Sequence, residues 1–190
     1  MALQGETGFD PVTVTLEEAN ADTAGAGPIV WLLVSMILTS NDIALVRLYT
    51  YATLNSYVKL ATLPSANRVL SSGTCYVTGW GRTSSKSALS NVLRYSYLPI
   101  VSRSTCTQAS WWGCSLIKSS MICAGGTTSR SACYGDSGGP LNCYIGRRWV
   151  VHGVTSFISS RGCNTVRKPS VFTRVSAFTS WINRVELTCC

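Results

Sequence analysis

Residues 135–140 read Gly-Asp-Ser-Gly-Gly-Pro, and no other stretch restricts the fold and the chemistry of this chain as strongly. A serine between glycines can sit on a tight turn, with its hydroxyl exposed and the neighbouring backbone N–H groups free. Such a turn suits a nucleophile whose oxyanion is held by main-chain donors. A Gly-rich turn is more often purely structural, so this stretch alone leaves both interpretations open.

A second stretch, residues 41–48, makes the catalytic interpretation more specific. It reads Asn-Asp-Ile-Ala-Leu-Val-Arg-Leu, so a lone acid, Asp42, opens an apolar strand pattern. A carboxylate in that position is costly to bury unless it has a partner. Asp42 and Ser137 together therefore indicate a nucleophilic site.

Outward from these stretches, the chain predicts an all-β fold. Short segments rich in β-branched and aromatic residues, or alternating in period two, are separated by turn-forming Gly, Ser and Cys: 75–80, 93–98, 149–155 and 171–174. Strands of this kind without intervening helices are typical of a barrel or a sandwich. Only the end changes period, because apolar residues recur at helical spacing from Val175 to Val185, with Ser176 as the expected N-cap. A short C-terminal helix packed on the barrel is predicted.

In these residues the chain resembles the chymotrypsin-like serine proteases, most closely the pancreatic elastases. The resemblance runs from about Asn41 to Val185 and is strongest in five stretches: 75–81, 121–126, 135–143, 151–157 and 168–175. It implies a chymotrypsin-like double β-barrel, with the second barrel and C-terminal helix present and the first barrel largely absent. Residues 1–40 are then an unmatched acidic and apolar leader, and residues 41–190 a partial trypsin-like serine protease domain.

The resemblance also implies roles for the site residues, which follow the known mechanism of that family. Ser137 is the nucleophile, and Asp42 orients the catalytic base. The backbone N–H groups of Gly135 and Ser137 form the oxyanion hole, and Ser156 lines the substrate edge beside Asp42. Asp136 is the acid that pairs with the α-amine freed on activation. No cofactor and no metal are implied.

A shallow, apolar specificity pocket follows from the same resemblance. Its base is Ser131, where trypsin-like enzymes place an Asp, so no buried anion attracts Lys or Arg. Its walls are Ile158 and Ser170, at positions that need Gly to admit an aromatic ring. Elastase-like cleavage after Ala, or after Val, is expected, with broad selectivity. Protein or peptide substrates with small aliphatic residues, and protease inhibitors, are the implied partners.

Nine cysteines with a single histidine favour disulfides over a zinc site, because no Cys-x-x-Cys pair occurs. By resemblance the disulfides are Cys75–Cys143, Cys106–Cys123 and Cys133–Cys163. Cys114, Cys189 and Cys190 then have no family partner. Disulfides imply an oxidising compartment, and the resemblance implies an extracellular, secreted protein. Residues 1–11, however, lack the basic start and apolar stretch of a signal peptide.

Two features argue against activity of this chain as written. No histidine precedes Asp42, although the family order is His, Asp, Ser, and the lone His152 falls in a strand pattern and is interpreted as structural. No Ile-Val-Gly-Gly-like sequence after a basic residue occurs in residues 1–41, so Asp136 lacks its amine and a zymogen-like oxyanion hole is expected.

The charge pattern changes abruptly near residue 41. Residues 1–41 hold five acidic residues and no Lys or Arg, whereas residues 42–190 hold all 16 basic residues and three acids. One hypothesis is an elastase-type endopeptidase whose sequence is incomplete or alternatively spliced. The alternative is a non-catalytic homologue acting as a cationic binding protein, and a third is a fragment that cannot fold.

Two further partner classes are not expected. Nucleic-acid binding is disfavoured because no basic helix or aromatic stacking platform is visible. The apolar run 28–38 is too short for a bilayer span, which needs about 20 residues, and favours a buried strand or helix over a membrane contact.

Overall fold

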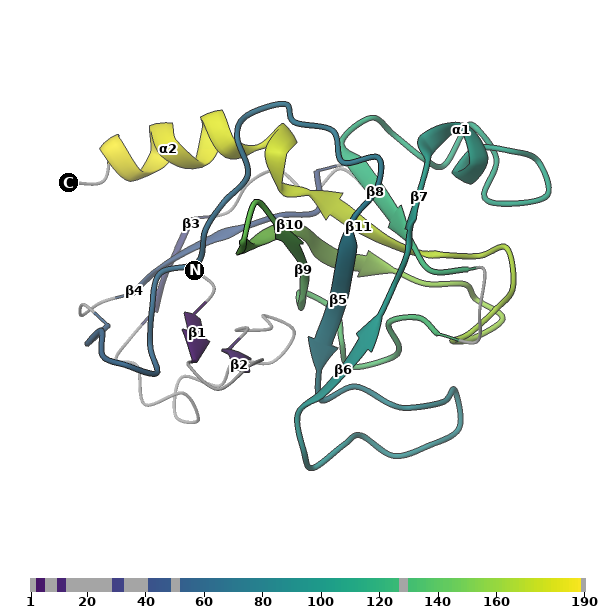
Figure 1. The fold of residues 1–190 in the computed structure, drawn as a ribbon, viewed down its shortest axis with the longest axis horizontal. Coiled ribbons are helices and arrows are strands. Elements are labelled where there is room, and N and C mark those ends of the chain that lie inside the picture. The colour runs from purple at the N-terminus through teal and green to yellow at the C-terminus, as the bar shows by residue number, and fades with distance from the viewer. Residues whose placement is uncertain are drawn as a thin grey trace.

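The computed structural model describes residues 3–5, 10–12, 29–32, 41–48, 52–126 and 130–188. Its main element is one antiparallel sheet with the strand order β6-β5-β9-β10-β11-β8-β7 (Figure 1). These strands are β5 (Thr74–Gly79), β6 (Arg94–Tyr97), β7 (Ile100–Val101), β8 (Met121–Ala124), β9 (Pro140–Ile145), β10 (Arg148–Phe157) and β11 (Ser170–Arg174). The four segments expected as strands are four of these, namely β5, β6, β10 and β11.

The two edges of this sheet are neighbours in the sequence, and this closes the sheet into a barrel. The N–H of Leu98, directly after β6, donates to the carbonyl of Cys75 at 2.9 Å. The next carbonyl, that of Pro99, accepts from the N–H of Gly125 at 2.8 Å, just after β8. The continuous segment from β6 to β7 is therefore hydrogen-bonded to β5 on one side and to the end of β8 on the other.

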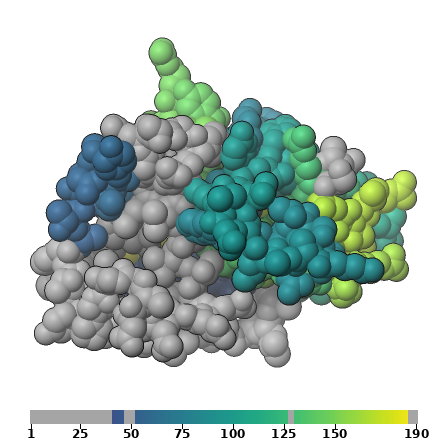
Figure 2. Space-filling model, turned by 90° about the horizontal axis from the view of Figure 1, so that it is seen from below, coloured from purple at the N-terminus to yellow at the C-terminus, as the bar shows by residue number. Residues whose placement is uncertain are grey.

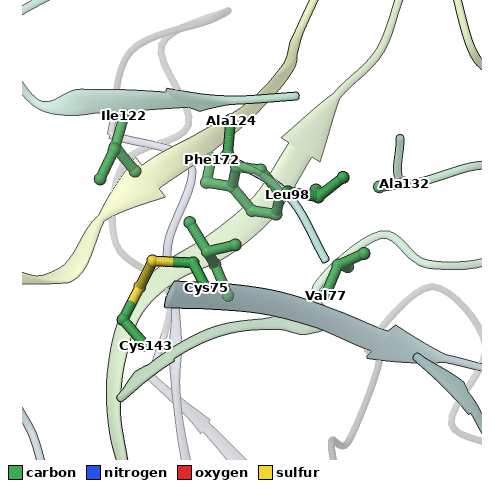
Figure 3. Packing of buried hydrophobic residues seen from close by; sticks show 9 residues of the cluster. Cys75, Val77, Leu98, Ile122, Ala124, Ala132, Cys143 and Phe172 are labelled. Carbon is green, nitrogen blue, oxygen red and sulfur yellow. A yellow bond between two sulfur atoms is a disulfide. The ribbon is translucent and has the colours of Figure 1, made fainter. Parts of the chain in front are cut away.

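The interior of the barrel explains the alternation in the sequence. Cys75 and Val77 point inward from β5 and join a buried cluster centred on Phe172, which is fully buried. Figure 3 shows Phe172 beside Leu98 and Ala124, with the Cys75–Cys143 disulfide at the side of the cluster. A Cβ at position 153 would lie 2.8 Å from the Cβ of Phe172, so β10 needs Gly153 to pass this ring.

Before β5 the described residues form two separate two-stranded sheets. One pairs β1 (Leu3–Gly5) with β2 (Asp10–Val12), and the other pairs β3 (Ile29–Leu32) with β4 (Leu45–Leu48). The first part of the apolar run 28–38 is thus a strand, and residues 33–40 lie outside the described residues. The predicted all-β fold, with the second barrel and the C-terminal helix, is confirmed.

Two helices flank the barrel, α1 (Arg103–Cys106) and α2 (Thr179–Thr188). The predicted C-terminal helix begins later than expected, because residues Val175–Ala177 form a 3₁₀ turn, η1. Ser176 lies inside this turn and is not a helix N-cap: its hydroxyl donates to the carbonyl of Arg68 at 2.5 Å. In the described part of the chain no helix is long and apolar enough to cross a membrane.

Three disulfides fasten the barrel and its loops, namely Cys75–Cys143, Cys106–Cys123 and Cys133–Cys163. These are the pairs that the family resemblance implied. Cys114 is free and exposed. Cys189 and Cys190, which have no family partner and are interpreted as an exposed tail in preference to an intermolecular link, lie outside the described residues.

Candidate active site

The loop that carries Ser137 leads directly into β9, the strand between β5 and β10. Because Val77 pairs with Leu141 and Val154 with Pro140, the end of β5 lies on one side of this loop and the end of β10 on the other. Two hydrogen bonds hold the turn: the N–H of Gly138 donates to the carbonyl of Thr155, and the N–H of Gly139 to that of Asp136, both at 2.9 Å.

Two backbone N–H groups of this turn are free. Among the described residues, the N–H groups of Gly135 and Ser137 have no acceptor, whereas the N–H of Asp136 between them donates to the carbonyl of Cys133 at 3.0 Å. Gly135 has a φ of +91° and Gly138 a φ of +73°, in the region that favours glycine. The Ser137 side chain is half-buried, and its hydroxyl has no partner among the described residues. The turn thus presents a hydroxyl that can act as a nucleophile and two N–H donors that can stabilise an oxyanion.

Asp42 is joined to the edge of β10. Its Oδ2 accepts a hydrogen bond of 2.6 Å from the hydroxyl of Ser156, and its carbonyl accepts one of 2.6 Å from the hydroxyl of Thr173 in β11. The pairing of β10 with β11 shifts register between Thr155 and Phe157, so Ser156 lies at a β-bulge. Bulges commonly redirect side chains beside active sites. Asp42 itself is exposed.

The carboxylate of Asp136 is held by the main chain. Its Oδ1 accepts from the N–H of Gly81 and its Oδ2 from the N–H of Cys133, each at 2.9 Å. A Cβ on Gly79 or on Gly81 would overlap Oδ1, so the two glycines form a cradle for this carboxylate. Burial raises the pKa of Asp136, and the hydrogen bonds from Cys133 and Gly81 oppose that shift.

The residues expected in the specificity pocket come from segments that the Cys133–Cys163 disulfide joins. The hydroxyl of Ser131 donates to Oδ1 of Asn164 at 3.2 Å and accepts from the N–H of Asn164 at 2.8 Å. Ser170 is fully buried in β11, and its hydroxyl accepts from the N–H of Ala132 at 2.9 Å. Ile158, just after β10, is half-buried and packs against the barrel core.

Sequence reasoning missed Asn164, which fixes the orientation of Ser131. Asn164 has a φ of +62°, a conformation that Asn adopts more easily than most residues. Its position directly after Cys163 was the available signal, because the disulfide to Cys133 brings it beside Ser131.

The single histidine is in the interior of the protein. His152 lies in β10, where the pairing with β9 shifts register between Val151 and Gly153, and it is 2% exposed. Burial, with a smaller contribution from the charge of Arg68, lowers the pKa of His152 from 6.5 to about 4. Its imidazole is therefore neutral at neutral pH, and no hydrogen bond joins it to Ser137.

His152 should make the protein sensitive to mild acid. The imidazole is less basic in the folded state than in the unfolded state, so stability falls as the pH drops below 6.5. We expect wild type to lose about 2 kcal/mol more than His152→Gln between pH 7.5 and pH 5. Urea unfolding at the two pH values measures this difference. Equal losses in the two proteins would show that His152 does not cause the sensitivity.

Comparison with known proteins places this site in context. The sequence model of one protein family, Trypsin, matches residues 14–182. Chymotrypsin-like elastase family member 1 of Felis catus is 55% identical over 150 residues, 78% of this chain and 56% of that protein. The Homo sapiens protein of the same name is 54% identical over 150 residues, 78% of this chain and 58% of its own length. Proproteinase E of Bos taurus is 51% identical over 149 residues, 77% of this chain and 58% of its own length. The chain thus spans a little over half the length of these relatives.

Proposed function

Because the chain belongs to the trypsin family and is an elastase-like serine protease by sequence, we propose that its function is that of a serine endopeptidase. The observation that carries the proposal is the turn at Ser137, where the hydroxyl of Ser137 and the N–H groups of Gly135 and Ser137 have no partner among the described residues. The Asp42–Ser156 hydrogen bond of 2.6 Å adds an oriented carboxylate at the neighbouring strand edge.

In the proposed reaction, Oγ of Ser137 attacks the peptide carbonyl carbon and loses its proton to a base. The carbonyl oxygen becomes an oxyanion, which the N–H groups of Gly135 and Ser137 stabilise. The base then passes its proton to the leaving amine as the C–N bond breaks, and water releases the acyl group by the reverse steps. Asp42 orients the base and stabilises its charged form.

The 190 residues do not supply that base. Their only imidazole is His152, which is buried in β10. We therefore propose that the chain as it stands is catalytically inactive, and that the sequence is a truncated form of an active protease. The relatives are longer, because the same 150 matched residues are 78% of this chain but only 56% of the Felis catus protein. Asp136 likewise accepts hydrogen bonds only from main-chain N–H groups among the described residues, so none of these residues supplies an activating amine.

A small specificity pocket is part of the proposal. Ser131 at the base carries no charge, and the half-buried Ile158 narrows the wall, so Ala or Val before the cut is favoured. Protein and peptide substrates with small aliphatic residues follow, together with protease inhibitors as partners. Three disulfides favour an extracellular, secreted location.

Enlarging the pocket should change this preference. We expect Ile158→Gly to raise kcat/KM for a Phe peptide relative to an Ala peptide by about tenfold, because an aromatic ring needs the removed side-chain volume. The measurement uses a chimera in which residues 1–40 are replaced by the upstream part of the Felis catus relative. Ile158→Val is the matched control and should keep the Ala preference. An unchanged ratio in Ile158→Gly would remove Ile158 from the pocket wall.

The same chimera tests the proposed function. Cleavage of Ala-rich peptides that Ser137→Ala abolishes supports the peptidase, and a folded chimera without such cleavage contradicts it. The N-terminal sequence and intact mass of the protein from its source complete the test. A mature start at an Ile-Val-like amine, with a histidine upstream of Asn41, supports the truncated protease, whereas a start at Met1 or Ala2 supports a pseudoenzyme.

The second candidate is a non-catalytic, cationic binding protein. Residues 43–185 contain all 16 Lys and Arg and one acid, Asp136, whose carboxylate is occupied by main-chain N–H groups. This excess of positive charge favours anionic partners. Retention on heparin that falls with added salt supports this candidate, and retention that ignores salt contradicts it.

A further inference from the structure

We propose that a cationic edge beside Ser137, formed by Arg82, Lys86 and Arg161, binds the acidic side chains of a peptide that lies across the site. All three side chains are exposed, and none is paired with a carboxylate among the described residues. The inference rests on the proposed function, because it assumes that peptides bind at Ser137. It adds a preference for Asp and Glu after the cut.

Two contacts with Tyr134 hold Arg82 next to the Ser137 loop, and a third, within its own loop, orients its side chain. Its N–H donates to the carbonyl of Tyr134 at 2.8 Å, and its guanidinium carbon lies 5.8 Å from the centre of the Tyr134 ring. One guanidinium nitrogen donates to the carbonyl of Ser85 at 3.3 Å. Tyr134 is 44% exposed and stands three residues before Ser137. The remaining guanidinium donors can bind a carboxylate, which Arg recognises with two parallel hydrogen bonds.

Lys86 and Arg161 reach the same edge from two loops in contact. The hydroxyl of Ser85 accepts a hydrogen bond of 2.9 Å from the N–H of Cys163, and a Cβ on Gly162 would overlap that hydroxyl. Lys86 follows Ser85 in the chain, and Arg161 precedes Gly162. Figure 2 shows the two loops together, with the teal residues that follow β5 beside the yellow-green residues that follow β10.

The strand order tells which part of a bound peptide meets this edge. The Ser137 loop lies between the end of β5, which leads to Arg82, and the end of β10, which leads to Ile158. A peptide whose residue before the cut is beside Ile158 must continue past Ser137 toward Arg82 and Tyr134. The residues after the cut therefore meet the cationic edge.

The distribution of acids points the same way. The only exposed carboxylate among the described side chains is that of Asp42, which is bonded to Ser156 on the β10 side. It repels acidic groups there, while the three cations attract them where the loop after β5 meets the loop after β10. An acidic peptide is favoured over a sulfated glycan because the edge borders the peptide-binding site.

Binding of two matched peptides to the 190-residue protein tests the inference. Both carry fluorescein and Ala-Ala-Ala, followed in one by Glu-Glu and in the other by Gln-Gln. At low salt we expect fluorescence anisotropy to give about tenfold tighter binding of the Glu peptide than of the Gln peptide. Each exposed ion pair should contribute a few-fold in affinity. Added salt should reduce the ratio. Arg82→Gln should reduce it to about threefold, and the control Arg148→Gln, at the first residue of β10, should leave it unchanged.

Four results would overturn the inference. The first two are equal affinities for the two peptides and no binding of either peptide. The third is an equal loss of the Glu preference in Arg82→Gln and in Arg148→Gln. The fourth is that a heparin oligosaccharide displaces the Glu peptide equally well from wild type and from Arg82→Gln. The outcome is separable from that of the proposed function. An active chimera with equal peptide affinities contradicts only the cationic edge, whereas a chimera without peptidase activity beside a tenfold Glu preference contradicts only the peptidase.

Discussion

The 190-residue chain should hydrolyse Ala-rich peptides no faster than its Ser137→Ala variant. Without a base the hydroxyl of Ser137 remains a neutral alcohol, and the only imidazole, that of His152, is 2% exposed inside the barrel. In a triad protease, loss of the histidine alone lowers turnover about a million-fold, or about 8 kcal/mol of transition-state stabilisation. Release of a chromogenic group from an acyl-Ala peptide measures this directly.

The controls separate a missing base from a misfolded protein. Circular dichroism and the three disulfides should be the same in wild type and in Ser137→Ala. The chimera with the upstream part of the Felis catus relative serves as the active reference. Turnover by the 190-residue chain that Ser137→Ala abolishes would mean that another group acts as the base, and the prediction would be wrong.

Removal of the Cys75–Cys143 disulfide should cost the most stability of the three bridges. It joins directly paired residues of β5 and β9 across 68 positions of sequence, and both cysteines are fully buried in the core. Loop closure over this length predicts a loss of about 4 kcal/mol in the double variant Cys75→Ala/Cys143→Ala. That is a large share of a typical stability of about 5–15 kcal/mol. Urea unfolding without reductant measures the loss.

The shorter bridge provides the matched control. Cys106–Cys123 closes 17 positions of sequence, so the same double replacement there should cost about 3 kcal/mol. Both variants leave Cys114 free and remove one disulfide each. A larger loss for Cys106–Cys123 than for Cys75–Cys143 would contradict the loop-length argument and would assign the stabilisation to local packing instead.

Much of the second barrel was predictable from sequence. The patterns at residues 75–80 and 149–155 became β5 and β10, because alternating β-branched and aromatic residues suit a sheet with one buried face. The boundary of α2 was not predictable from apolar spacing. The same spacing is compatible with the 3₁₀ turn at Val175–Ala177, which the hydroxyl of Ser176 joins to the carbonyl of Arg68.

The candidate site divides in the same way. Residue types and their order indicated Ser137 and Asp42, and the family resemblance implied their separate roles and the three disulfides. The cradle of Gly79 and Gly81 around Asp136 was not visible in the sequence, because the carboxylate and the glycines are 55 or more positions apart. Their contact depends on β5 lying next to β9.

The sequence by itself determined the all-β fold, the Gly-rich turn that carries Ser137 and the excess of basic residues, because these follow from local patterns and composition. Only the tertiary structure decided what surrounds the turn. The bulge at Ser156 directs its hydroxyl to Asp42, and the contact of Ser85 with Cys163 brings Lys86 and Arg161 to the edge that Arg82 begins. Such contacts depend on strand order and register, which are set by the free energy of the whole packed barrel and not by any single segment.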